Sequence, residues 1–173
     1  MDPLASNRRV VGRNPRARRR LGSDSRRGAV AVEFACVAPL LLGLIVGVSE
    51  LTRIYEVQNV LESAAREGAR FAALDRDGML LPGQTANNKL VSDVKNFLAT
   101  MGFDKNDVAV AVVRASDPSQ AFDLDDPAND MELFKVQVSI PYSKVSYTPV
   151  AQDSDYALSA AITFRNGRAT LSD

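Results

Sequence analysis

The stretch "RRGAVAVEFACVAPLLLGLIVGVSE", residues 26–50, decides how this chain is organised. From Ala29 to Ser49 it gives 21 residues in which Glu33 is the only charge. As a helix they would extend about 31 Å, enough to cross the hydrocarbon core of a bilayer. A buried helix of a soluble domain is the alternative. Pro39 is awkward for both, although membrane helices tolerate a proline where neighbours satisfy the freed carbonyl. We predict a transmembrane helix over residues 29–50.

Charge is distributed unevenly on the two sides of this run. Residues 1–28 hold nine arginines and two aspartates, a net charge of +7, whereas the remainder holds 12 Lys and Arg against 19 Asp and Glu, a net charge of −7. The first 27 residues are rich in Arg, Ser, Gly and Pro and lack apolar periodicity, so we expect a disordered basic leader. Clustered arginines can bind nucleic acid. They end where the apolar run begins, however, which favours a topological role that holds the N-terminus in the cytoplasm. We therefore expect a membrane and no nucleic acid as partner.

The composition makes an enzyme an unfavoured interpretation. The chain has no histidine, which removes the commonest general base and zinc ligand. Its one cysteine, Cys36, lies in the apolar run, so no intrachain disulfide can form. The Asp-rich stretch 116–130 could bind calcium or carry a carboxylate-based enzyme site, but Pro127 breaks the EF-hand pattern. We predict a solvated loop there, and no catalytic residue, metal site or cofactor.

The helical pattern continues beyond the apolar run and predicts an amphipathic extension over residues 51–76. Apolar or small residues recur at spacings of 3 and 4, typical of one helix face, at Ile54, Val57, Leu61, Ala64, Gly68 and Phe71. A second, narrower stripe consists of Ala65, Ala69 and Ala73. Small residues also let helices approach closely, so we take Gly43, Gly47, Ala64 and Gly68 as candidate helix-packing positions.

The remainder, residues 77–173, predicts a small extracytoplasmic α+β domain. A short helix is expected at 87–102, followed by strands at 107–115, 132–142 and 156–166. Apolar and polar residues alternate most clearly in the second strand, at Phe134, Val136, Val138 and Ile140. The predicted fold class is therefore α+β: a basic leader, one long N-terminal helix, and a small antiparallel sheet packed with one short helix.

The start of the apolar run resembles the processing site of type IV prepilins. That family has a basic leader, a glycine before the scissile bond and a glutamate as fifth residue of the mature chain. Arg26, Arg27, Gly28, Ala29 and Glu33 occupy those positions here. Ala29 replaces the bulky first residue of many major pilins. Glutamate followed by an aromatic, as in Glu33-Phe34, resembles the tight-adherence (Tad, or Flp) branch better.

The resemblance extends to the TadE-like proteins of that branch. Their "VEF…P" membrane helix and "AAREGAR" helix are matched within residues 31–73, and residues 136–168 resemble the end of the family loosely. The resemblance implies a minor pilin or pseudopilin in the bacterial inner membrane, cleaved between Gly28 and Ala29 by a prepilin peptidase. Implied partners are other pilin or pseudopilin helices and the pilus assembly platform. The alternative is an uncleaved, signal-anchored extracytoplasmic domain that binds a ligand or an envelope component.

Glu33 is the residue whose presence in an apolar helix needs a reason. A charged carboxylate near the bilayer centre costs roughly 2.5 to 3.5 kcal/mol or more. Cleavage after Gly28 would create an α-ammonium on Ala29, about one helical turn from Glu33. The carboxylate of one helix could then pair with the ammonium of its neighbour and set axial register. The alternative is that Glu33 reaches the cytoplasmic headgroups.

Overall fold

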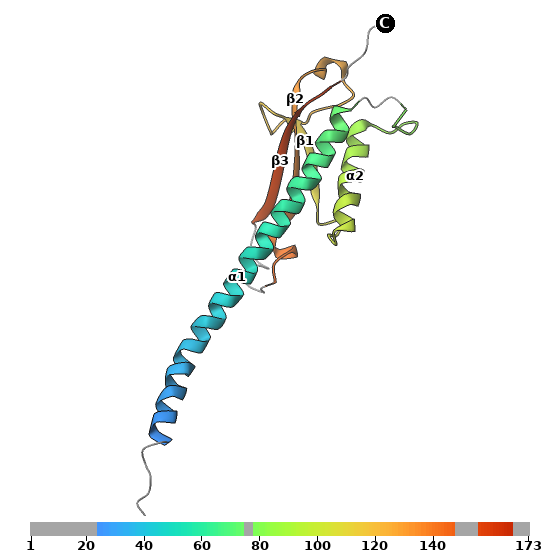
Figure 1. Cartoon of the computed structure of the whole chain (residues 1–173). Helices are drawn as coiled ribbons and strands as arrows, with labels where there is room; N and C mark the ends of the chain where they lie inside the picture. The colour runs from blue at the N-terminus through green and yellow to red at the C-terminus, as the bar shows by residue number, and fades with distance from the viewer. Residues whose placement is uncertain (1–23, 75–77, 148–155, 168–173) are drawn as a thin grey trace, which may run out of the picture. The chain divides into compact units, whose positions relative to one another are not determined.

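The computed structural model describes residues 24–74, 78–147 and 156–167, with side chains from residue 28 onward. These residues form helices α1 (Asp24–Ala73) and α2 (Ala86–Thr100) and strands β1 (Ala109–Arg114), β2 (Leu133–Pro141) and β3 (Ala157–Arg165), as Figure 1 shows. Two short 3-10 turns, η1 (Pro127–Asn129) and η2 (Tyr142–Lys144), flank β2. The predicted α+β fold is confirmed. Most of the predicted leader, residues 1–23, lies outside the described residues.

Helix α1 begins before the predicted transmembrane segment. Its first residue is Asp24, five residues ahead of Ala29, so the prediction of disorder through residue 27 is wrong for residues 24–27. Arginine, which occupies two of these four positions, is a good helix former, which fits the earlier start. Pro39 lies inside α1 without ending it.

The chain divides into two compact units, residues 1–44 and 45–173. In the second unit the three strands form one antiparallel sheet in the order β1-β2-β3. Val136 at the centre of β2 pairs with Val112 on β1 and with Ile162 on β3. Alternate β2 residues, from Phe134 to Ile140, are buried, as the sequence pattern predicted. One face of the sheet therefore belongs to the core.

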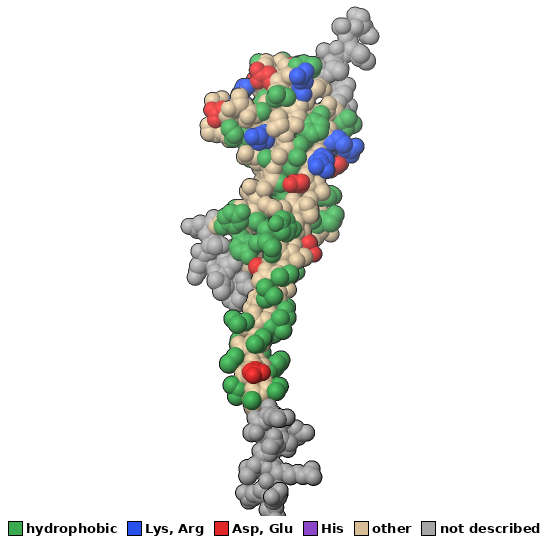
Figure 2. Space-filling model, turned by 60° about the vertical axis from the view of Figure 1, so that its left-hand side comes forward, with side chains coloured by type: hydrophobic (Ala, Val, Ile, Leu, Met, Phe, Trp, Pro, Cys, Tyr) green, Lys and Arg blue, Asp and Glu red, His purple; other side chains and the backbone are tan. Residues whose placement is uncertain are grey.

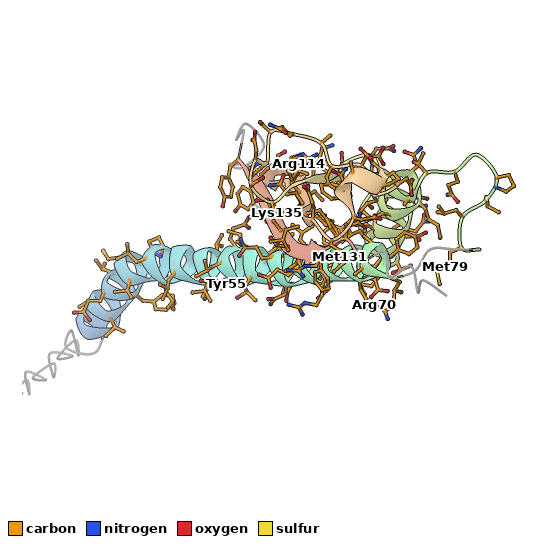
Figure 3. All side chains as sticks on the ribbon, turned by 90° about the horizontal axis from the view of Figure 1, so that it is seen from above. Tyr55, Arg70, Met79, Arg114, Met131 and Lys135 are labelled. Carbon is orange, nitrogen blue, oxygen red and sulfur yellow. The ribbon has the colours of Figure 1, made fainter. Side chains whose placement is uncertain are left out.

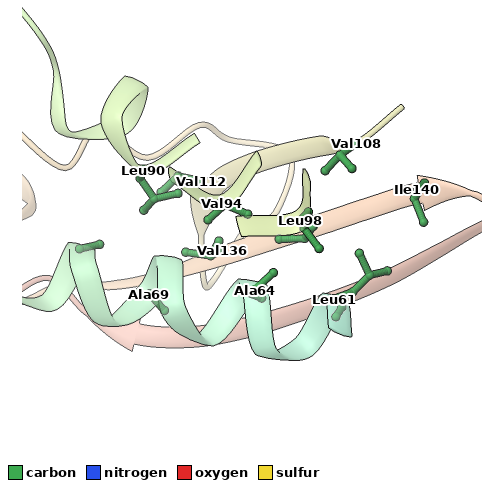
Figure 4. Close-up of a cluster of buried hydrophobic side chains, with 14 of the residues drawn as sticks. Leu61, Ala64, Ala69, Leu90, Val94, Leu98, Val108, Val112, Val136 and Ile140 are labelled. Atoms are coloured by element: carbon green, nitrogen blue, oxygen red, sulfur yellow. The ribbon is translucent and has the colours of Figure 1, made fainter. Parts of the chain in front are cut away.

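The core of the second unit joins both helices to that face of the sheet. Figure 4 shows Leu61, Ala64 and Ala69 of α1 directed toward the side chains of α2 and the strands. Helix α2 contributes residues at every fourth position, as expected for one helix face, namely Leu90, Val94 and Leu98. The Asp-rich stretch also supplies two fully buried side chains, Phe122 and Leu124. The domain is thus built around the second half of α1.

Candidate functional site

The predicted processing site lies in the first turns of α1. Gly28 and Ala29 are helical and exposed. A bond inside a helix must unwind to enter a protease site, and glycine costs a helix about 1 kcal/mol relative to alanine. Gly28 therefore makes this turn of α1 easier to open than alanine would. Glu33 lies about one turn further along, next to Phe34, whose side chain is 69% exposed.

The apolar part of α1 has no protein covering it among the described residues. Its large side chains from Val30 to Val48 are more than half exposed, and the helix from Gly28 to Ala73 has an 18-residue window of mean hydropathy 2.4 that is 0% buried. It is the one helix in the described ranges that is long and apolar enough to cross a membrane. An uncovered apolar helix of this kind fits a single-pass membrane protein, because lipid or other helices can cover it.

Of the four candidate helix-packing residues, two are open and two are already used inside the domain. A Cβ added at Gly43 or Gly47 would meet nothing within 4 Å, so both leave a free surface on the apolar helix. Ala64 and Gly68 are instead buried. A Cβ at Gly68 would lie 2.7 Å from Val94 Cγ2, so this glycine allows α1 and α2 of the same chain to approach each other.

The structure also reveals a contact that the sequence analysis did not predict. Glu50, the first charged residue after the apolar run, binds the segment that follows β2. The Tyr142 hydroxyl donates to Glu50 Oε1 at 2.5 Å, and the Tyr147 amide donates to Glu50 Oε2 at 3.2 Å. The hydrogen bond to Glu50 raises the pKa of Tyr142, and burial adds to this effect. We call these residues, with Arg53, the juxtamembrane latch.

Arg53 holds the same segment from the next turn of α1. Its Nε donates to the Val145 carbonyl oxygen at 3.3 Å. Its guanidinium carbon lies 5.4 Å from the Tyr147 ring centroid and 5.9 Å from that of Phe103. The charged pair after the apolar run, Glu50 and Arg53, was the available signal, but the hydrogen-bond partners of this pair in the latch are more than 90 residues away in sequence.

The Asp-rich stretch uses its carboxylates to shape itself. Asp123 Oδ1 accepts from the Asp125 amide at 3.0 Å, Asp126 Oδ1 from the Ala128 amide at 2.9 Å, and Asp125 Oδ2 from the Ala86 amide at 2.7 Å. The last bond satisfies a free N–H at the start of α2. Within the described residues no group of three or more His, Cys, Asp or Glu could hold a metal ion.

Comparison with known proteins supports the resemblance found in the sequence. The family model described as "TadE-like protein" matches residues 28–70, which run from the predicted processing site to the last turn of α1. The TadE-like resemblance is therefore confirmed over this segment. No curated protein and no solved structure matches the chain.

Proposed function

We propose that this chain, whose residues 28–70 are TadE-like, is a non-enzymatic, pseudopilin-like protein of the bacterial inner membrane that helps assemble or anchor a Tad-type pilus or a related secretion apparatus. The observation that carries the proposal is the uncovered apolar half of α1, which contains Glu33 and continues into a folded domain. Such a helix requires lipid or neighbouring helices to cover it.

The proposed orientation places the N-terminus in the cytoplasm and the α+β domain outside it. Nine arginines precede the apolar run, whereas Glu50 and Arg53 follow it in balance. Positive charge close to the end of a span retains that end in the cytoplasm. The Gly28–Ala29 bond then lies at the cytoplasmic face, where a prepilin peptidase would release the leader.

After that cleavage, Glu33 has a specific partner in an assembly of side-by-side helices. The new α-ammonium of Ala29 on one copy or on a related pilin can pair with the Glu33 carboxylate of its neighbour. Each charge then offsets part of the desolvation cost of the other. Further along α1, the exposed Gly43 and Gly47 let the backbones of neighbouring helices approach closely.

The test replaces Glu33 by glutamine, which keeps size and hydrogen bonding and removes the charge. Breaking one side of a buried pair costs about 3 to 5 kcal/mol, so association should fall a hundredfold or more. Insertion and cleavage after Gly28 should persist. The readouts are crosslinked oligomer yield and pilus or secretion output at matched protein level, with the exposed Glu62→Gln as control.

Wild-type output from the Glu33→Gln strain would contradict the pairing and favour a glutamate that only reaches the headgroups. Retention of the leader in the wild-type protein, together with normal output, would favour the signal-anchored binding domain instead. N-terminal sequencing of the protein from its native membrane separates these two outcomes.

A further inference from the structure

The tyrosines of this chain gather at one end of the folded domain. There are four tyrosines and no tryptophan. Tyr142, Tyr147 and Tyr156 surround the juxtamembrane latch: the Tyr142 amide donates to the Tyr156 carbonyl oxygen at 2.9 Å, and the two rings form an edge-on pair with centroids 6.2 Å apart. Tyr55 follows Glu50 on α1 by five residues, about 7.5 Å along the helix. We call these four residues the tyrosine collar.

The latch fixes the level of this collar along α1. The apolar run ends at Ser49, and Tyr142 is bonded directly to Glu50. If the run fills the hydrocarbon core, the collar lies just outside it. The headgroup layer on each side is roughly 5 to 8 Å thick, which matches the height from Glu50 to Tyr55.

Three of the four collar residues are exposed, whereas Tyr142 is partly buried against the core. Tyr147 is 69% exposed, Tyr156 61% and Tyr55 60%. Met101, at the end of α2, is also exposed and lines a groove of about 390 Å³ with Arg53 and Phe103. Tyrosine combines an apolar ring with a polar hydroxyl, and it is enriched where one end of a side chain meets hydrocarbon and the other meets water.

The charges nearest the latch are largely paired within the domain. At the collar, Arg53 lies between Glu50 and Glu56, with Glu56 Oε2 at 3.6 Å, and Lys144 pairs with Asp107 at 3.1 Å. The opposite end of β2, roughly 26 Å away, carries the Asp-rich stretch 116–130. Figure 2 shows hydrophobic side chains gathered around the base of the domain, and both acidic and basic side chains toward its far end. The collar end can therefore approach anionic lipid without strong repulsion.

We propose that the tyrosine collar lies in the phospholipid headgroup layer of the leaflet from which α1 emerges. The partner is the lipid interface itself, and the latch holds the base of the domain against it. The collar would thereby fix the height and tilt at which the domain is presented to the rest of an assembly. This inference rests on the proposed membrane-spanning placement of α1.

Because the chain has no tryptophan, a single introduced tryptophan reports on its own surroundings by fluorescence. Single Tyr147→Trp and Tyr156→Trp variants of the full chain are placed in phosphatidylcholine vesicles whose acyl chains carry bromine either near the headgroup or near the tail end. Leu41→Trp, in the middle of the apolar run, and Met79→Trp, beyond the far end of α1 (Figure 3), are the reference positions. Both collar variants should emit at shorter wavelength than Met79→Trp and lose most intensity with shallow bromine. Leu41→Trp should lose most with deep bromine.

Three results would overturn the proposal, and they are distinguishable. If bromine quenches Leu41→Trp but neither collar variant, α1 lies in the membrane and the collar does not contact the lipid. If the collar variants emit at shorter wavelength but bromine does not quench them, the collar tyrosines are buried against protein and not against lipid. If bromine does not quench Leu41→Trp, α1 does not lie in the bilayer. Both the proposed membrane span and the collar proposal are then wrong.

Discussion

Gly68→Ala tests how tightly α1 and α2 pack. The added methyl would lie 2.7 Å from Val94 Cγ2 and 3.5 Å from both Leu90 Cδ2 and Val136 Cγ1. Favourable carbon–carbon contacts lie at about 3.5 to 4.0 Å, so the contact with Val94 is the one that must relax. Val94 lies in the interior of α2, where a β-branched side chain has one strongly preferred rotamer. The clash between the added methyl and Val94 can therefore be relieved only if α2 moves.

Two opposing effects set the size of the change. Alanine is better than glycine in a helix interior by about 1 kcal/mol. Overpacking a filled core typically costs about 1 to 3 kcal/mol. We expect the clash to outweigh the propensity gain, with a net loss of about 1 kcal/mol in the free energy of unfolding. For a domain of this size that lowers Tm by roughly 4 °C.

The assay is thermal unfolding of the detergent-solubilised full chain, followed by near-ultraviolet circular dichroism of its tyrosines. Gly47→Ala is the matched control, because its methyl meets nothing within 4 Å. A Gly68→Ala/Val94→Ala double variant should lose less stability than the two single losses combined, by at least about 0.5 kcal/mol. A Tm for Gly68→Ala at or above that of the wild type, with additive behaviour in the double variant, would refute the close-packing explanation.

Four further outcomes are expected. Leu61→Ala should lower the free energy of unfolding by about 2 to 5 kcal/mol in the same assay, because Leu61 is fully buried in the core. Tyr142→Phe should raise amide hydrogen exchange in residues 142–147 severalfold with little change in Tm. In the wild type, the raised pKa of Tyr142 means that its contact with Glu50 is complete below the ordinary value of 10.0 and is lost as pH rises through the raised one. The difference in tyrosinate absorbance between the wild type and Tyr142→Phe during an alkaline titration checks this. Gly28→Leu should leave a precursor longer by 28 residues, visible by gel mobility and N-terminal sequencing.

Much of the fold could be predicted from the local spacing of apolar residues, which can be read directly from the sequence. The 21-residue apolar run predicts a span because its length matches a bilayer. The 3-and-4 spacing beyond it predicts the face of α1 that is buried, and Val57 and Leu61 on that face are fully buried. Alternation in β2 predicts its inward residues equally well. In each case neighbouring residues specify the geometry, so no knowledge of distant contacts is needed.

What only the tertiary structure decided depends on contacts between residues far apart in the chain. The spacing of Ala64 and Gly68 is the same whether they face another chain or α2, and only the packing of α2 assigns Gly68 to the domain core. Glu50 and Tyr142 are 92 residues apart, and their bond exists because the sheet returns the end of β2 to the middle of α1. Periodicity reports which face of an element is apolar. The residue that meets that face depends on every turn and strand register between the two positions.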